Sequence, residues 1–204
     1  MKSAVFFERD GVINAYAKGA SSKEPPTTVE AFKLLGGIEP LMASLKEAGL
    51  LIFVTTHQPG LSQGTLDRRE LERMHMIMQA KLPIDEVLIC PHEASDGCSC
   101  AKPNTGLYKD LEHQYRIDMD HSYVVSDKWQ DAAAAHTLGC ISVMLDSPHL
   151  GKAPRDYVTS SLDEVGEKIL YLHAHQSEWT SPGAGPAFQV VVSDATEHGE
   201  GEHK

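Results

Sequence analysis

Two carboxylates stand directly after the first apolar run of the chain, in the segment Glu8-Arg9-Asp10-Gly11. Residues i and i+2 of an extended chain point the same way, so Glu8 and Asp10 would project to one side. Gly11 then permits a sharp exit from the strand. Paired carboxylates of this kind suit a hard divalent cation, because Mg²⁺ prefers oxygen ligands.

Polar side chains also follow three later apolar runs. They are Thr56, His57 and Gln58 after the second run, Lys102 beyond the third, and Ser126, Asp127, Lys128 and Asp131 at the end of the fourth. Ligands of parallel α/β sheets bind beyond the carboxyl ends of the strands, and lysine neutralises phosphoryl charge. The pattern predicts one site for a divalent cation and a phosphate. Any one of these residues taken alone would instead be read as a solvated loop residue.

Four soft metal ligands cluster within eleven residues: Cys90, His92, Cys98 and Cys100. Three thiolates and one imidazole match a closed tetrahedral zinc site, which is structural because no coordination position is left for water. This clustering indicates a metal rather than disulfides, and hence a reducing compartment. Zinc would hold the loop 90–100 so that Lys102 stays over the cleft. The isolated Cys140 is expected in the core.

Short apolar runs alternate with amphipathic stretches, which is typical of βαβ units and predicts an α/β fold with a parallel sheet. The expected strands are 3–7, 50–55, 86–90, 122–126 and 140–145, with a short one at 156–159. The expected helices are 38–48, 66–82, 107–115, 129–138 and 162–173. Met74 and Met78 fall on the apolar face of the second helix and are expected in the core.

The composition predicts one ordinary domain. The 204 residues are 41% hydrophobic and 23% charged, which excludes a disordered chain, a collagen and a coiled coil. A net charge of -11 argues against general electrostatic binding of nucleic acid or anionic membrane, so a nucleic-acid-binding zinc regulator is a weak alternative. No secretory signal or membrane span is evident, and a cytoplasmic location is expected.

We expect residues 1–176 to form this domain and residues 177–204 to be a poorly ordered acidic tail, because Gly, Pro, acidic residues and His dominate there. The segment 189–192 could add an edge strand. His173, His175, His198 and His203 lack the fixed spacing of metal ligands and are not expected to bind one.

The motifs, taken in order, resemble those of the haloacid dehalogenase (HAD) superfamily, and within it the small zinc-containing phosphatases of heptose-bisphosphate and histidinol-phosphate type. The resemblance covers residues 5–170. The opening Asp-x-Asp-Gly-Thr/Val motif corresponds to Glu8–Val12, and the second motif to Thr56 in Thr-His-Gln-Pro-Gly. The third is Lys102 in Cys-Ala-Lys-Pro, and Gly-Asp-Lys-x-x-Asp corresponds to 126–131.

The resemblance implies a Rossmann-like parallel sheet with helices on both faces and no large cap domain. It implies that the residue at position 8 attacks phosphorus to give an acyl-phosphate, and that Asp10 serves as acid and base. Asp127 would hold Mg²⁺ together with Glu8 and the backbone carbonyl of Asp10. The expected substrate-binding residues are Thr56, His57, Gln58, Lys102 and Lys128.

The sequence departs from the family pattern at the nucleophile, where Glu8 replaces aspartate. One added methylene moves the carboxylate by about 1 Å, and misplacement of that size can cost about 10²-fold in rate. Turnover is therefore expected to be impaired, or to survive at a low rate if the backbone adjusts. Other departures are His57 for Asn, Pro59 for Ser, Ala101 for Arg and Ser126 for Gly, and the missing arginine removes a bidentate phosphate partner.

These observations predict a monomeric, magnesium-dependent phosphomonoesterase that contains zinc. Its partner would be a small phosphorylated metabolite, with D-glycero-D-manno-heptose 1,7-bisphosphate as the candidate, and neither nucleic acid nor a membrane. The alternative is a catalytically inactive relative that binds a phosphorylated ligand or a protein partner, which Glu8, Ala101 and Ser126 motivate.

Overall fold

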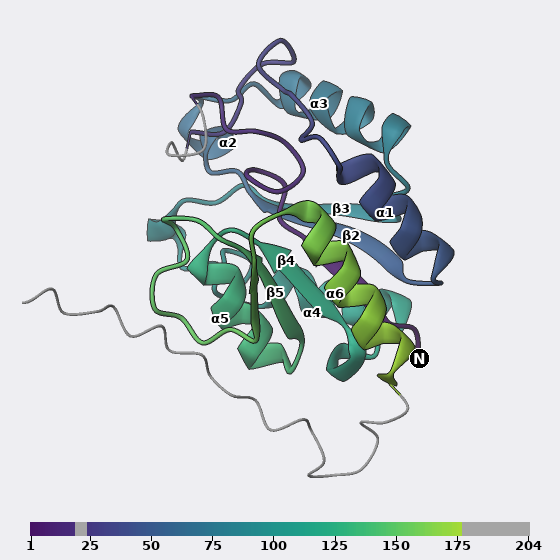
Figure 1. The fold of residues 1–204 in the computed structure, drawn as a ribbon. Helices are drawn as coiled ribbons and strands as arrows, with labels where there is room; N and C mark the ends of the chain where they lie inside the picture. The colour runs from purple at the N-terminus through teal and green to yellow at the C-terminus, as the bar shows by residue number, and fades with distance from the viewer. Residues whose placement is uncertain (19–23, 177–204) are drawn as a thin grey trace, which may run out of the picture.

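The computed structural model describes residues 1–18 and 24–176, and within them six parallel strands form one sheet in the order β3-β2-β1-β4-β5-β6 (Figure 1). The predicted parallel α/β fold is confirmed. The strands are β1 (Ala4–Phe7), β2 (Leu51–His57), β3 (Glu86–Cys90), β4 (Tyr123–Ser126), β5 (Ile141–Leu145) and β6 (Tyr157–Thr159).

The central strand is apolar throughout because both faces of the sheet are covered. All four residues of β1 are buried. Val5 and Phe7 contribute to the core on one face, while Ala4 and Phe6 contribute to the core on the other. Alternate side chains of one strand therefore serve two cores, which fixes the direction in which the residues after Phe7 leave the sheet.

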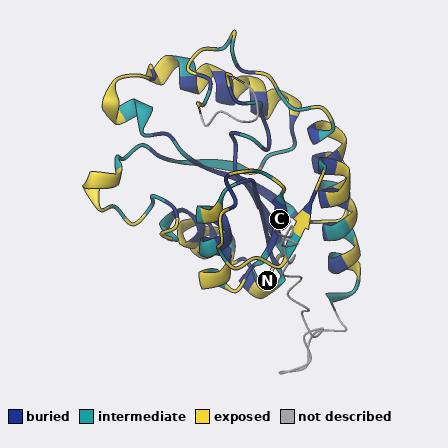
Figure 2. Ribbon diagram, turned by 60° about the vertical axis from the view of Figure 1, so that its left-hand side comes forward, coloured by how far each residue is buried: buried dark blue, intermediate teal, exposed yellow. Residues whose placement is uncertain are grey.

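Helices cover both faces of the sheet. α1 (Ile38–Glu47), α3 (Arg68–Lys81) and α6 (Leu162–Ala174) supply apolar side chains to the first core, and α4 (Gly106–Tyr115) and α5 (Trp129–Leu138) supply the second. Their buried sides face the sheet and their exposed sides face outward (Figure 2). Met74 and Met78 lie in the first core and Cys140 in the second, as expected.

The observed elements differ from expectation mainly at their ends. β2 runs two residues further than expected, because Thr56 and His57 pair with Ile89 and Cys90 of β3. The four-residue α2 (Gly60–Gln63) and the 3-10 turns η1 (Ala94–Asp96) and η2 (Met119–His121) were not expected. Each is too short to show an apolar period.

The long connection from β1 to α1 packs on the main domain: its residues Val12, Ile13 and Phe32 join the first core. No described segment forms a cap with a core of its own.

The expected acidic tail 177–204, the edge strand 189–192, His198 and His203 lie outside the described residues. His173 and His175 contact the backbone carbonyls of Ala48 and Tyr171.

Within the described ranges, no helix combines the length and the apolar character needed to cross a membrane.

Candidate active site and metal-binding loop

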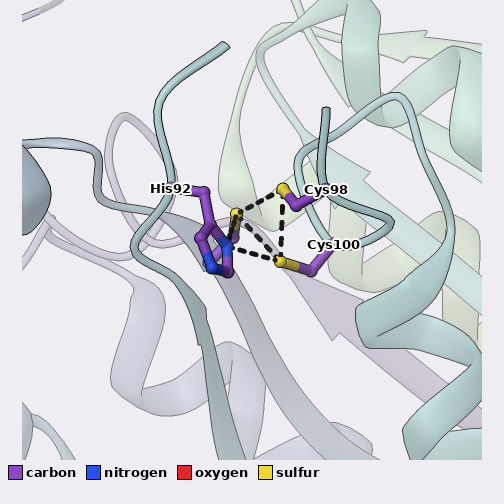
Figure 3. A group of neighbouring side chains, drawn as sticks. His92, Cys98 and Cys100 are labelled. Atoms are coloured by element: carbon purple, nitrogen blue, oxygen red, sulfur yellow. Dashed lines mark hydrogen bonds between the residues drawn. The ribbon is translucent and has the colours of Figure 1, made fainter. Parts of the chain in front are cut away.

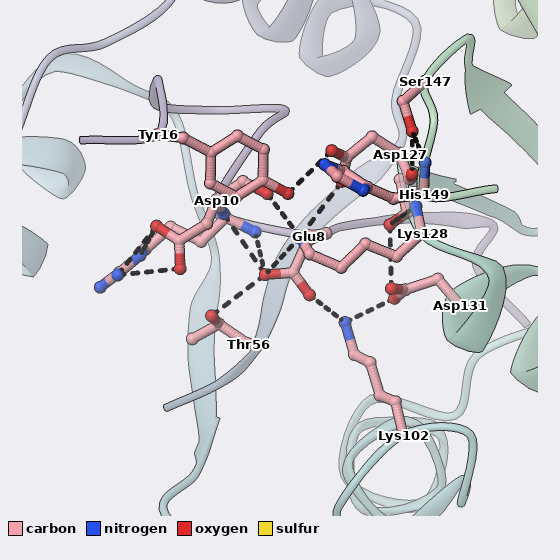
Figure 4. Close-up of polar contacts among 12 residues, drawn as sticks. Glu8, Asp10, Tyr16, Thr56, Lys102, Asp127, Lys128, Asp131, Ser147 and His149 are labelled. Carbon is pink, nitrogen blue, oxygen red and sulfur yellow. Dashed lines mark hydrogen bonds and ion pairs between the residues drawn. The ribbon is translucent and has the colours of Figure 1, made fainter. Parts of the chain in front are cut away.

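The candidate site lies where β1, β2 and β4 end. Parallel pairing sets Phe7 beside Val54 on one side and Val125 on the other, so the residues that follow these strands meet at one edge. Figure 4 shows Glu8, Asp10, Thr56, Lys102, Asp127, Lys128 and Asp131 gathered there. The structure thus brings together groups that are far apart in the sequence.

Glu8 is almost fully buried and hydrogen-bonded at both carboxylate oxygens. Its Oε2 lies 2.8 Å from the Lys102 ammonium, and its Oε1 accepts from the Thr56 hydroxyl at 3.2 Å and from the Arg9 backbone at 3.0 Å. Burial alone would raise the pKa of Glu8, but Lys102 and Lys128 outweigh it and lower this pKa to about 2. Glu8 is therefore an oriented anion at neutral pH.

Lys102 is held by two carboxylates and a carbonyl. Besides Glu8, its ammonium lies 2.5 Å from Asp131 and donates to the Thr55 carbonyl at 2.7 Å. Burial would lower the pKa of Lys102, but Asp131 and Glu8 raise it well above its usual value. Asp131 in turn accepts from Ser126 at 2.9 Å and Tyr108 at 2.8 Å. Ser126 and Asp131 thus position the lysine rather than face the open cleft.

The Asp10 carboxylate is surrounded by donors. It accepts from the Arg9 guanidinium at 2.9 and 3.0 Å, from Gln58 at 2.6 Å and from Asn14 at 2.9 Å. The Gln58 amide also donates to the Thr56 hydroxyl at 2.9 Å, so this expected substrate-binding residue contacts the site's own side chains. These contacts fix the orientation of the Asp10 carboxylate.

Arg9 and His75 belong to the site but were not predicted. Arg9 is fully buried, and its Nη1 lies 3.1 Å from Nε2 of His75. His75 lies one position after Met74 and four after Leu71 on the buried face of α3, and that placement could have identified it as a buried polar group. Nothing in the sequence distinguishes Arg9 from a solvated arginine.

The Lys128 ammonium lies among oxygens from three residues. It donates to the Asp10 carbonyl at 2.5 Å and to Asp127 Oδ1 at 3.1 Å, and it lies 3.8 Å from Glu8 Oε1 (Figure 4). The other Asp127 oxygen accepts from the Tyr16 hydroxyl at 2.8 Å. This set of hard oxygens around one cation fits the ligands expected for Mg²⁺.

Three further residues of this region were also missed. Tyr16 donates to the Asp127 carboxylate, Ser147 donates to the Asp127 carbonyl at 2.5 Å, and the His149 ring packs edge-on against Tyr16 with centroids 5.9 Å apart. All three lie in loops, where side chains follow no period that a sequence pattern could reveal.

The cysteine and histidine loop has the expected arrangement. Sγ of Cys90, Cys98 and Cys100 and one ring nitrogen of His92 all lie within 4.8 Å of one another (Figure 3). Three sulfur atoms and one imidazole nitrogen at this separation fit a structural zinc ion. The expected clustering of these four side chains is confirmed.

The loop is also tied to the candidate active site. Lys102 follows Cys100 by two residues. His57, an expected substrate-binding residue, points from the end of β2 to this loop, where its Nε2 lies 2.8 Å from the His92 carbonyl. The structure therefore places His57 at the metal-binding loop and not among the carboxylates.

Comparison with known proteins agrees with this arrangement. The model of the HAD-hydrolase-like family matches residues 99–165. D-glycero-beta-D-manno-heptose-1,7-bisphosphate 7-phosphatase of Bordetella bronchiseptica is 33% identical over 141 residues, covering 67% of this chain and 76% of the relative. The protein of the same name from Pseudomonas aeruginosa is 30% identical over 154 residues, covering 71% and 81%.

A solved structure of similar fold holds ligands. The D,D-heptose 1.7-bisphosphate phosphatase from B. bronchiseptica, complexed with magnesium and phosphate, matches with a TM-score of 0.73 and 27% identity. The match covers 84% of this chain and 99% of that one. The resemblance inferred from the motifs is confirmed.

Proposed function

We propose that this chain hydrolyses a small sugar phosphate. The premise is that the chain belongs to the family of HAD-like phosphatases that includes the D-glycero-beta-D-manno-heptose-1,7-bisphosphate 7-phosphatases. The family consists of hydrolases of phosphate monoesters. The first substrate to test is D-glycero-D-manno-heptose 1,7-bisphosphate, which the relatives' name specifies. The observation that carries the proposal is the convergence of Glu8, Thr56, Lys102 and Asp127 at one sheet edge.

In this proposal Glu8 is the nucleophile. Its carboxylate attacks phosphorus, the bond from phosphorus to the leaving oxygen breaks, and an acyl-phosphate forms on Glu8. The low pKa of Glu8 keeps the attacking group ionised, and Thr56 and Lys102 already contact it. Water then cleaves the acyl-phosphate and releases inorganic phosphate.

Asp10 would donate a proton to the leaving oxygen and then take one from the attacking water. Arg9, Asn14 and Gln58 donate to its carboxylate and hold it in one orientation beside Glu8.

Glu8, Asp127 and the Asp10 carbonyl would hold Mg²⁺, which when bound neutralises negative charge that develops on the phosphoryl group. Zinc at Cys90, His92, Cys98 and Cys100 would hold the loop that carries Lys102.

The alternative function is binding of a phosphorylated ligand without turnover. The length of the Glu8 side chain favours this alternative.

The deciding experiment measures phosphate release over a panel of sugar mono- and bisphosphates for the unaltered chain, Glu8→Asp and Glu8→Gln. We expect slow turnover by the unaltered chain, turnover about 10²-fold faster with Glu8→Asp, and none with Glu8→Gln, which lacks a carboxylate nucleophile. Turnover by Glu8→Asp alone would support the ligand-binding role for this chain. Turnover by Glu8→Gln equal to that of the unaltered chain would exclude Glu8 as the nucleophile.

A further inference from the structure

Lys128 supplies a positive charge at the point where the oxygens of the proposed magnesium site meet. Its ammonium lies 2.5 Å from the Asp10 carbonyl, 3.1 Å from Asp127 Oδ1 and 3.8 Å from Glu8 Oε1. Figure 4 shows its side chain reaching into this group of oxygens. We infer that Lys128 is a built-in competitor of Mg²⁺: its ammonium lies among the oxygens that would hold the metal, and it must leave when Mg²⁺ binds.

The two cations exclude each other because they need the same oxygens. Mg²⁺ binds oxygen at about 2.0–2.1 Å and demands near-ideal octahedral geometry. An ion bound to the Asp10 carbonyl and Asp127 Oδ1 would therefore compete with the ammonium for the same oxygen atoms. Like charges at such a separation in a largely buried site also repel strongly.

The surroundings allow the ammonium to leave without disturbing the oxygens. The Lys128 side chain is 22% exposed, so it has a path toward solvent, while Asp127 and Glu8 are nearly buried. Tyr16 holds the second Asp127 oxygen, and Ser147 holds the Asp127 carbonyl. Glu8 keeps its contacts with Lys102 and Thr56. The acceptors thus stay in place when the lysine withdraws.

The metal-free protein would depend on Lys128 for charge balance. Without it, Lys102 would still pair with Glu8, but Asp127 would lose its ammonium partner, and this loss would destabilise the fold. The lysine therefore stabilises the metal-free state at the expense of metal affinity. This inference rests on the proposed magnesium site but not on turnover, so it can be tested without a substrate.

The experiment measures Mg²⁺ binding by calorimetry on zinc-containing, magnesium-free protein. Lys128→Met removes the charge and keeps most of the side-chain length, and Lys109→Met, at an exposed position of α4, is the matched control. We expect Lys128→Met to bind Mg²⁺ with a Kd at least about tenfold lower than the unaltered chain, within the usual range of coupling between two sites. Lys109→Met should leave the Kd unchanged. The rise in melting temperature on adding Mg²⁺ should also be larger for Lys128→Met.

An equal or weaker affinity of Lys128→Met for Mg²⁺ would overturn the competition while leaving the proposed magnesium site intact. Binding by neither chain would remove that site and the inference together.

A second measurement uses the unaltered chain, in case Lys128→Met does not fold. Its lysines are labelled with an amine-reactive reagent and read by mass spectrometry. Lys128 should react faster with Mg²⁺ present than without, and Lys109 equally in both; an unchanged rate at Lys128 would contradict the inference.

Discussion

Two buried side chains, Arg9 and His75, contact each other next to the Asp10 carboxylate. The Arg9 guanidinium is fully buried, binds Asp10 and contacts Nε2 of His75. Burial and the neighbouring Arg9 charge lower the pKa of His75 to about 4. His75 is thus neutral at pH 7, so that it can accept a hydrogen bond from Arg9 and help hold the arginine against Asp10.

This arrangement predicts a loss of stability in mild acid. An unfolded histidine takes up a proton near pH 6.5, while folded His75 does so only near pH 4. Between these values the unfolded state binds more protons, so the free energy of unfolding falls as the pH falls, by about 2 kcal/mol at pH 4.5. Urea unfolding at pH 7 and pH 4.5 should show a smaller loss for His75→Gln than for the unaltered chain. Equal losses in both would contradict the assignment.

Which site residues could be predicted depends on what precedes them in the sequence. Glu8, Thr56 and Asp127 each follow an apolar run, and the strands formed by those runs lie side by side, so their convergence followed from the fold class. Arg9 lies between two carboxylates, and Tyr16 lies in a loop. Their contacts arise only from the tertiary packing, which no local pattern records.

At the scale of elements, the metal-binding loop connects β3 to α4 and passes Lys102 across the candidate site. Cys90 is the last residue of β3, and the Gly106 amide at the start of α4 donates to the Ser99 carbonyl inside the loop. The path of the loop is therefore fixed at both ends by secondary structure and in the middle by its metal ligands.

Cys98→Ser is expected to reduce the bound zinc below one ion per chain and to lower the free energy of unfolding by about 3 kcal/mol or more, because zinc binding contributes directly to folding. Metal analysis and thermal melting test both effects. Cys140→Ala, outside the cluster, is the control and should retain one zinc. Full zinc content and an unchanged melting temperature in Cys98→Ser would contradict the assignment.

The longer elements could be predicted because their physical causes are local. β1 and β4 are buried on both faces, β1 is apolar throughout and β4 is apolar up to its last residue, Ser126, and α1 and α6 carry one apolar face each. The exact end of β2 could not be predicted, because Thr56 and His57 are polar and extend the strand only through pairing with β3.

At the scale of the whole molecule, the end of the last helix is tied to the start of the sheet. The side-chain amide of Gln176 donates to Ser3 Oγ at 3.4 Å and to the Tyr123 hydroxyl at 3.3 Å. These contacts join the residues after α6 to the residue before β1 and to β4. We propose that the domain ends near Gln176.

A chain ending at Gln176 is expected to keep the melting temperature and Mg²⁺ affinity of the full chain. A chain ending at Tyr171 should melt at a lower temperature, because it also loses Leu172, which is buried in the first core. Thermal melting and calorimetry on the three lengths test the boundary. A clear loss of stability on removing 177–204 alone would show that the domain extends beyond Gln176.

The central place of β1 has a consequence for synthesis on the ribosome. β1 precedes the other strands in the sequence, and β2 can pair with one of its edges once residue 57 has been made, but β4 can pair with the other edge only once residues 123–126 have been made. One apolar edge of β1 therefore stays open while the residues between β1 and β4 are made, and such an edge can template wrong pairing. Asp127 follows directly after β4, so the nascent protein pairs the second edge of β1 and completes its candidate cation site in the same step.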